Sequence, residues 1–252
     1  DQDGLQDVFI LSEGGQSKLM RNLGGSYEDA TSEVGLTNSL SLNKSSWHDF
    51  NGDGKLDVAI AGEEGSAIYI AEGDGFRELD VSAATAVTKA RGVAWLNSGF
   101  LFATENGTRF LEYTGDDKFE NQTSEKGLVD YSDGSDVAVA DFDGDGYDDA
   151  FVTNIVGINR LFRHVPESAT YESADEQIEQ SDNPATAASW EVMDGQSLPD
   201  LSIANWDGGN EQHENYDGEF IDAAAELGIH DAGNSTALGW GRLHSDLDKS
   251  LY

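Results

Sequence analysis

The chain has 252 residues, of which 38% are hydrophobic and 10% aromatic, so it can bury a large core and is not expected to be disordered. Its 49 acidic residues outnumber 14 basic ones, and the formal net charge of −35 makes nucleic acid and anionic membranes poor partners. The sequence has no cysteine and no apolar run near the about 18 residues of a membrane span, so disulfides, thiol chemistry and a membrane span are not expected.

The first repeat unit, approximately residues 1–40, opens on a fragment of an acidic loop. Residues 1–7 read D-Q-D-G-L-Q-D and match the last seven positions of a nine-residue loop that occurs complete in two later units. A strand-like V-F-I-L and a second strand at 18–22 follow. The fragment predicts a partial calcium site that lacks its first ligand and retains Asp1, Asp3, the carbonyl of Leu5 and Asp7.

The second unit, approximately residues 41–88, contains the complete loop D-F-N-G-D-G-K-L-D at 49–57, between a strand that leads to Trp47 and the apolar run V-A-I-A. Oxygen-bearing side chains occupy alternate loop positions, and Ca²⁺ takes six to eight oxygen ligands at about 2.3–2.6 Å. An EF-hand loop needs a glutamate at its twelfth position and flanking helices, whereas this loop joins two strands, so its ninth residue must complete the coordination. The predicted ligands are Asp49, Asn51, Asp53, the carbonyl of Lys55 and Asp57.

The third unit, approximately residues 89–134, passes from strand to strand through N-S-G at 97–99, so no metal site is expected there. The fourth unit, approximately residues 135–185, restores the loop as D-F-D-G-D-G-Y-D-D at 141–149. Its predicted ligands are Asp141, Asp143, Asp145, the carbonyl of Tyr147 and Asp149. The alternative is that both complete loops are only hairpin turns, which Asn-Gly and Asp-Gly favour. We favour calcium, because four acidic or amide groups at period two repel one another unless a cation joins them.

The fifth unit, approximately residues 186–236, keeps only Asp194 and Asp200 of the loop ligands, so we predict an empty site there. Its polar stretch at 205–218, N-W-D-G-G-N-E-Q-H-E-N-Y-D-G, is interpreted as a long loop between strands. The sixth unit, residues 237–252, is partial. Residues 238–243 could act as the first strand of unit one and close a five-bladed ring; missing blades or a strand from a neighbouring chain are the alternatives.

The spacing of the two complete loops predicts the architecture. Asp53 and Asp145 hold the same loop position and lie 92 residues apart across two units, so one unit is about 46 residues long. A period of about 40–50 residues with four short strands per unit is typical of propeller blades. We predict an all-β fold, a single β-propeller domain over residues 1–252 with four-stranded blades, five to six in this chain, which can be part of a larger propeller. A β-sandwich with coincidental repetition is the alternative.

The loops at 49–57 and 141–149, the N-R-L-F-R strand at 159–163 and closing segments such as K-F-E-N-Q-T-S-E-K-G-L carry a resemblance to a known group. The chain resembles the FG-GAP/VCBS repeat propellers of integrin alpha subunits and, more closely, the cartilage acidic protein family. The resemblance covers essentially the whole chain. It implies that blades bind calcium in the turn between their first two strands, on one face of the propeller, through the two ligand sets named above.

No G-x-S-x-G, H-E-x-x-H or phosphate loop is present. We therefore predict a calcium-binding module that acts outside the cell in binding, adhesion or structure, on a protein or glycan partner, without catalysis. One alternative is a subunit of an extracellular assembly or filament, because an open propeller exposes strand edges that invite self-assembly. Another is a propeller lyase or hydrolase for polysaccharide or phospholipid, which would need clustered His, Arg and Tyr, and 14 basic residues make such clusters scarce.

Overall fold

Short antiparallel strands make up almost all of the regular structure. The computed structural model describes residues 3–12, 14, 16–37, 41–80, 87–179, 181–193, 197–230, 233–241 and 250–251. Within these residues the strands form one three-stranded sheet, four four-stranded sheets and one two-stranded pair. Each sheet is a meander in which neighbours in sequence are neighbours in space, so each repeat unit folds as one blade.

The blades follow chain order. Blade 1 consists of β1 (Val8–Ile10), β2 (Lys18–Asn22) and β3 (Tyr27–Asp29). Blade 2 consists of β4 (Leu42–His48), β5 (Asp57–Gly62), β6 (Ala67–Glu72) and β7 (Gly75–Glu78). Blade 3 consists of β8 (Ala90–Leu96), β9 (Gly99–Thr104), β10 (Gly107–Gly115) and β11 (Lys118–Asn121).

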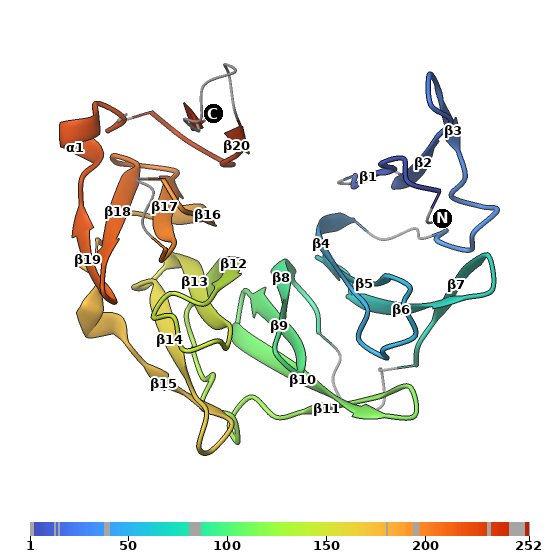
Figure 1. Ribbon diagram of the computed structural model, residues 1–252, viewed down its shortest axis with the longest axis horizontal. Coiled ribbons are helices and arrows are strands. Elements are labelled where there is room, and N and C mark those ends of the chain that lie inside the picture. The colour runs from blue at the N-terminus through green and yellow to red at the C-terminus, as the bar shows by residue number, and fades with distance from the viewer. Residues whose placement is uncertain are drawn as a thin grey trace.

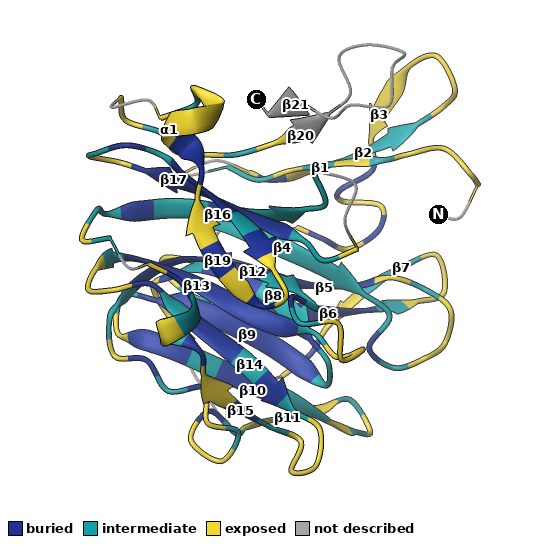
Figure 2. Cartoon of the chain, turned by 60° about the vertical axis from the view of Figure 1, so that its left-hand side comes forward, coloured by how far each residue is buried: buried dark blue, intermediate teal, exposed yellow. Residues whose placement is uncertain are grey.

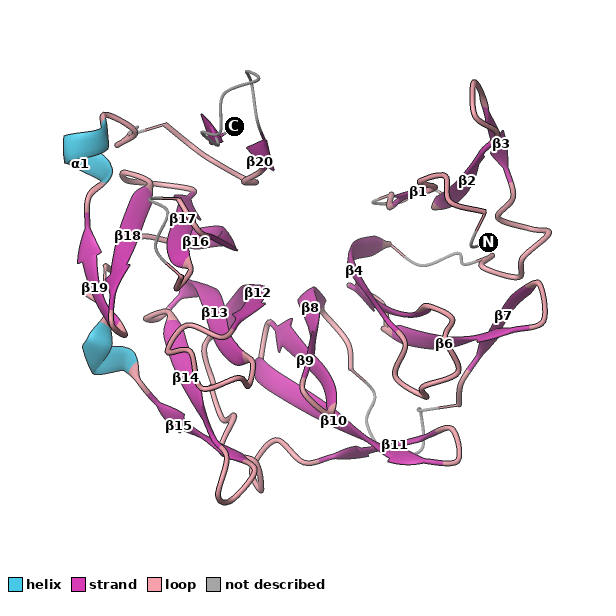
Figure 3. Cartoon of the chain, in the orientation of Figure 1, coloured by secondary structure: helices cyan, strands magenta, loops and turns pink. Residues whose placement is uncertain are grey.

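Blades 4 and 5 have the same composition. Blade 4 consists of β12 (Asp133–Ala140), β13 (Asp149–Val156), β14 (Arg160–Val165) and β15 (Thr170–Ser173). Blade 5 consists of β16 (Ala185–Glu191), β17 (Asp200–Asn205), β18 (Glu211–Tyr216) and β19 (Glu219–Asp222). A 3-10 turn at Asp175–Gln177 and the short helix α1 (Ala224–Leu227) follow β15 and β19 (Figure 3). No helix in the described ranges has both the length and the apolar character needed to cross a bilayer.

The blades are arranged around a common axis, with the first strand of each blade innermost (Figure 1). The inner strands contact one another in sequence, β4 with β8, β8 with β12 and β12 with β16. This is the arrangement of a β-propeller, and the predicted fold class is confirmed.

The hydrophobic core lies between blades rather than within any one of them. Four clusters of buried side chains join blades 1 and 2, 2 and 3, 3 and 4, and 4 and 5. Every residue of β5, β9 and β17 is buried, because both faces of these second strands are covered by neighbouring blades (Figure 2). A blade therefore becomes stable only when its neighbours are in place.

The last described strands form a separate pair. β20 (Trp240–Gly241) pairs with β21 (Ser250–Leu251), with Trp240 opposite Leu251. The suggestion that residues 238–243 supply the first strand of unit one is wrong for the described residues of that segment, since β1 pairs only with β2. The register of β20 explains the difference: Trp240 stands opposite Leu251 as Trp47 stands opposite Val58, so the pair repeats the first two strands of a blade.

The polar stretch at 205–218 is not the long loop that its composition suggested. Its central part is β18, in which Glu211, Gln212 and His213 are buried. These side chains are accommodated by hydrogen bonds within the blade: Ser202 donates to Gln212 at 2.5 Å, and Glu211 lies 3.0 Å from His213 Nε2. These hydrogen bonds lower the cost of burying part of each side chain, while Gln212 Nε2 and His213 Nδ1 have no partner among the described residues. Composition alone does not reveal this pairing.

Truncation of an inter-blade core residue should destabilise the whole protein. Phe102 is fully buried between blades 2 and 3, and Phe102→Ala should lower the free energy of unfolding by about 3–5 kcal/mol because it leaves a cavity. Tyr131, which is 86% exposed, is the control, since Tyr131→Ala should change that free energy by less than about 0.5 kcal/mol. Urea denaturation followed by tryptophan fluorescence measures both, and equal effects of the two substitutions would contradict the inter-blade core.

Candidate metal sites

The loop at 141–149 joins β12 to β13 and is organised around its first aspartate. Asp141 accepts three backbone N–H groups: Oδ1 bonds Gly144 at 2.8 Å and Asp145 at 3.1 Å, and Oδ2 bonds Gly146 at 2.9 Å. Gly144 and Gly146 have φ of 79° and 90°, a backbone conformation that glycine adopts without the strain a side chain would add. The sequence therefore wraps the loop around the Asp141 carboxylate.

Three of the predicted ligands in this loop are brought together. Asp141, Asp143 and Asp149 each present an oxygen, and these oxygens lie within 4.8 Å of one another. Asp145 is outside this group, and its Oδ1 accepts the Tyr147 N–H at 2.8 Å. The geometry thus supports three carboxylates of the predicted set directly and places the fourth beside them in the loop.

The loop at 49–57 between β4 and β5 repeats these bonds almost one for one. Asp49 accepts the N–H groups of Gly52, Asp53 and Gly54 at 2.8–3.1 Å, and Asp53 Oδ1 accepts that of Lys55 at 2.8 Å. Asn51 stands where the other loop has Asp143, so this loop holds one fewer carboxylate.

The ninth loop residue has a structural role that the sequence did not indicate. In each case Oδ1 accepts a backbone N–H at 2.7–2.9 Å, from the third strand in blades 2, 4 and 5 and from β2, the second described strand, in blade 1. These bonds join Asp57 to Ala71, Asp149 to His164, Asp200 to Asn215 and, in blade 1, Asp7 to Asn22. Because the bond persists in blades 1 and 5, where the loop is incomplete, the ninth aspartate holds the blade together as well as closing the loop. Its recurrence in units that had lost other ligands was the available signal.

These buried carboxylates are costly to ionise. Burial raises the pKa of Asp149 to about 7, and the negative charges of Asp143 and Asp145 add to the effect against two backbone hydrogen bonds that lower it. Burial likewise raises the pKa of Asp57 to about 6, and burial is also the main cause of the raised pKa of Asp143. A cation at this position would remove the repulsion that opposes ionisation.

The donor set fits a hard divalent cation. Both loops offer carboxylate oxygens and the carbonyl at their seventh position, at Lys55 or Tyr147, with no nitrogen or sulfur ligand among the predicted residues. Oxygen-only sets of this kind suit calcium rather than zinc or copper.

The incomplete loops are less informative. In blade 1 Asp3 Oδ1 accepts the Leu5 N–H at 2.8 Å, as Asp53 does for Lys55, while Asp1 lies outside the described residues. In blade 5 Asp200 is placed, but Asp194 lies outside the described residues, so the empty site there stays a prediction.

Blade 3 has a short turn in place of the nine-residue acidic loop, and this turn contacts the loop at 141–149 of blade 4. Asn97, at φ 51° in the turn between β8 and β9, donates from Nδ2 to the Asp148 carbonyl at 2.7 Å and accepts the Asp148 N–H at 3.1 Å. The same Nδ2 lies 2.8 Å from the Tyr171 hydroxyl. The Asp148 N–H belongs to the peptide whose carbonyl is that of Tyr147, and a trans peptide directs its C=O opposite to its N–H. Asn97 therefore orients a predicted ligand carbonyl.

Comparisons with known proteins support the fold. Residues 100–152 match the family model described as FG-GAP-like repeat, a segment that includes the whole loop at 141–149. No curated protein matches the sequence. The FG-GAP part of the predicted resemblance and the propeller are confirmed, and the resemblance to cartilage acidic proteins stays a prediction.

Solved structures of similar fold have low sequence identity. BBS1N, in a complex with ARL6DN, is 13% identical with a TM-score of 0.59, over 100% of this chain and 72% of that chain. A lectin from Agrocybe aegerita that recognises non-reducing terminal N-acetylglucosamine is 16% identical with a TM-score of 0.53, over 87% and 62%. An extracellular domain from B. thetaiotaomicron is 13% identical with a TM-score of 0.53, over 86% and 27%. The chain spans less than two thirds of the last two proteins.

The raised pKa of Asp149 predicts how the metal-free protein responds to pH. Its folded pKa of about 7 exceeds the unfolded value of about 3.9, so the stability it contributes is complete below the unfolded value and is lost as pH rises through about 7. In chelator, the melting temperature should therefore be higher at pH 6 than at pH 8. Asp149→Asn lowers stability by breaking one hydrogen bond but should flatten this pH dependence, and an unchanged pH dependence in that variant would contradict the assignment.

Proposed function

We propose that this chain, a β-propeller that carries an FG-GAP-like repeat, is a calcium-stabilised binding module that acts outside the cell. The observation that carries the proposal is the convergence of Asp141, Asp143 and Asp149 oxygens within 4.8 Å, in a loop whose hydrogen bonds are repeated in blade 2. Calcium at both loops would offset part of the net charge of −35 and join the first two strands of each blade to the third.

Three features support binding outside the cell as the activity. The similar propellers include a protein in a complex, a lectin and an extracellular domain, so propellers of this shape present surfaces to proteins or glycans. Extracellular calcium is high enough to fill sites of modest affinity. A strongly acidic surface is also better tolerated where salt and calcium screen its repulsion.

Self-assembly and catalysis are the two alternative functions, and each would need a different structural feature. Self-assembly is favoured by β1, whose edge opposite β2 has no strand among the described residues and which exposes Val8 and Ile10. A catalytic propeller would need a constellation of acid, base and substrate-binding groups, and we propose binding without catalysis.

Calcium should raise the melting temperature through both loops. If free calcium is about a hundredfold above its dissociation constant, each site contributes about 2.7 kcal/mol, or about 5–10 °C for a chain of this size. The matched variants are Asp143→Ala with Asp145→Ala in blade 4 and Asn51→Ala with Asp53→Ala in blade 2. Each double variant should lose about half of the shift. Identical melting of the wild type in calcium and in chelator would refute the calcium proposal.

Asn97 should affect the calcium affinity of one site only. Asn97→Gly keeps the positive φ but removes the contact to Asp148, so the blade 4 site should bind calcium about tenfold more weakly, as loss of an outer-shell contact commonly does. The blade 2 site should be unchanged. Calorimetric titration of each site alone, in the double variant that disables the other, gives the two values.

The control for Asn97 is the next residue of the same turn. The Ser98 side chain donates its hydrogen bond to Glu112 within its own blade, so Ser98→Ala should leave both affinities unchanged. Equal weakening of both sites by Asn97→Gly would indicate a general loss of stability instead of a local effect on the blade 4 loop.

A further inference from the structure

A cavity of about 390 Å³ opens around the propeller axis, at the end of the inner strands remote from the metal loops. Its walls come from blades 1 to 5, and its polar side chains are Asn43, Glu63, Arg91, Ser135 and Thr186. Inner strands begin at this cavity and end at the loops: Asn43 is the second residue of β4, and Asp49 follows its last. The cavity is therefore separate from the calcium sites by the length of a strand.

The polar wall is produced by one backbone feature repeated in four blades. In β4 the pairing with β5 jumps from Leu42 opposite Gly62 to Lys44 opposite Ala61, so Asn43 is an extra, unpaired residue. The same jump occurs in β8, β12 and β16. The four bulged residues are Asn43, Arg91, Ser135 and Thr186, and all four line the cavity. Bulges turn side chains out of the regular sheet pattern and are common beside binding sites.

Three of the four bulged side chains are held by the next blade, and the fourth, Thr186, donates to the Ala204 carbonyl of its own blade and to the Ser235 carbonyl. Asn43 Nδ2 donates to the Ala90 carbonyl at 2.9 Å, and Ser135 Oγ donates to the Ala185 carbonyl at 2.6 Å. Arg91 Nη1 donates to the Gly134 carbonyl at 3.2 Å. In these three cases the acceptor is the residue just before the next bulge, so the contacts between successive blades hold the wall in place. A wall whose side chains are already ordered costs little entropy when a ligand binds.

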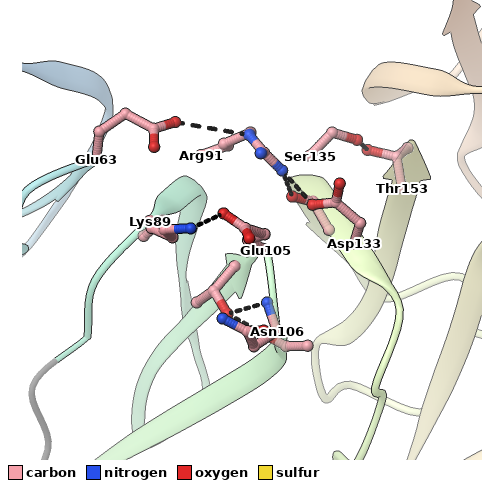
Figure 4. A network of polar contacts seen from close by, with 12 residues as sticks. Glu63, Lys89, Arg91, Glu105, Asn106, Asp133, Ser135 and Thr153 are labelled. Atoms are coloured by element: carbon pink, nitrogen blue, oxygen red, sulfur yellow. Dashed lines mark hydrogen bonds and ion pairs between the residues drawn. The ribbon is translucent and has the colours of Figure 1, made fainter. Parts of the chain in front are cut away.

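Arg91 retains binding capacity after these contacts are made. Figure 4 shows its guanidinium between Glu63, whose Oε1 lies 3.7 Å from Nε, and Asp133, which contacts Nη1. Among the described residues Nη2 has no hydrogen-bond partner, and the side chain is 26% exposed. Two carboxylates around one guanidinium leave a negative balance, which disfavours an anionic ligand.

We propose that this cavity is a binding site for a neutral, hydroxyl-rich ligand, namely one or two sugar rings. Arg91 Nη2 supplies donors, while Glu63 and Asn43 Oδ1 supply acceptors, and a hydroxyl group can satisfy both kinds. Leu11, Leu42 and Ile155 add an aliphatic wall suited to the C–H face of a sugar. The volume is within the about 300–1,000 Å³ of small-ligand sites. The proposal gives a ligand class to the binding function proposed above and does not depend on calcium.

The test is a titration of the wild-type chain with glucose, galactose, N-acetylglucosamine, cellobiose and, as the anionic comparison, glucuronate, followed by saturation-transfer NMR and calorimetry. At least one neutral sugar should bind, and Arg91→Met should weaken it about tenfold or more, as loss of a hydrogen bond to a charged group does. The matched control is Lys89→Met: Lys89 is the neighbouring cation, pairs with Glu105 and does not line the cavity. This variant should bind the sugar like the wild type.

A second variant guards against misfolding of the first. Ile155→Trp is designed to fill the cavity while Asn43, Arg91 and Ser135 keep their hydrogen bonds to the next blade. It should therefore abolish sugar binding while calcium still raises its melting temperature. Sugar binding that persists in Ile155→Trp, or that Arg91→Met and Lys89→Met weaken equally, would overturn the site. A wild type that binds glucuronate but no neutral sugar, or none of these sugars, would overturn the ligand class. These outcomes are separate from the calcium result. A chain whose melting temperature does not respond to calcium could still bind sugar, and a chain that responds to calcium could fail to bind sugar.

Discussion

The ninth-position aspartate is the constraint on which both the blades and their acidic loops depend. Its side chain is buried, and its two oxygens accept N–H groups from the loop and from the third strand, as Asp149 does from Phe142 and His164. The same carboxylate is turned toward the other acids of the loop. One residue thus ties three strands together and creates a negative charge that is costly to bury.

That cost is the physical basis of the proposed link between calcium and stability. Without a cation, burial and neighbouring charges raise the pKa of Asp149 to about 7 and that of Asp57 to about 6. Protonation would relieve the repulsion, but it would turn one acceptor oxygen of each protonated carboxyl group into a donor. A divalent cation relieves the repulsion while keeping the carboxylates ionised, and the first two strands and the third then share one site.

The two ends of the inner strands carry different kinds of side chain. At one end the chain turns through acidic loops that are rich in glycine, and at the other a bulge in each strand turns a side chain toward the axis. Between these two ends, the strands are occupied by packing against neighbouring blades, in clusters of buried side chains. This separation allows the loops to stabilise the ring while the opposite end differs from blade to blade, with Asn, Arg, Ser and Thr at equivalent positions.

The sequence by itself determined the repeat, the propeller and the members of each loop. Those features are local: the ligand spacing lies within nine residues, and the period follows from where the loops recur. Sequence reasoning failed at β18, because buried polar residues such as His213 look like a solvated loop until their partners are known. Only the tertiary structure decided which loop is supported from outside and where a cavity forms. Asn97 meets Asp148 across 51 residues of chain, and the four bulges meet only when the blades close around the axis. Such contacts depend on how neighbouring blades pack, which no local pattern encodes.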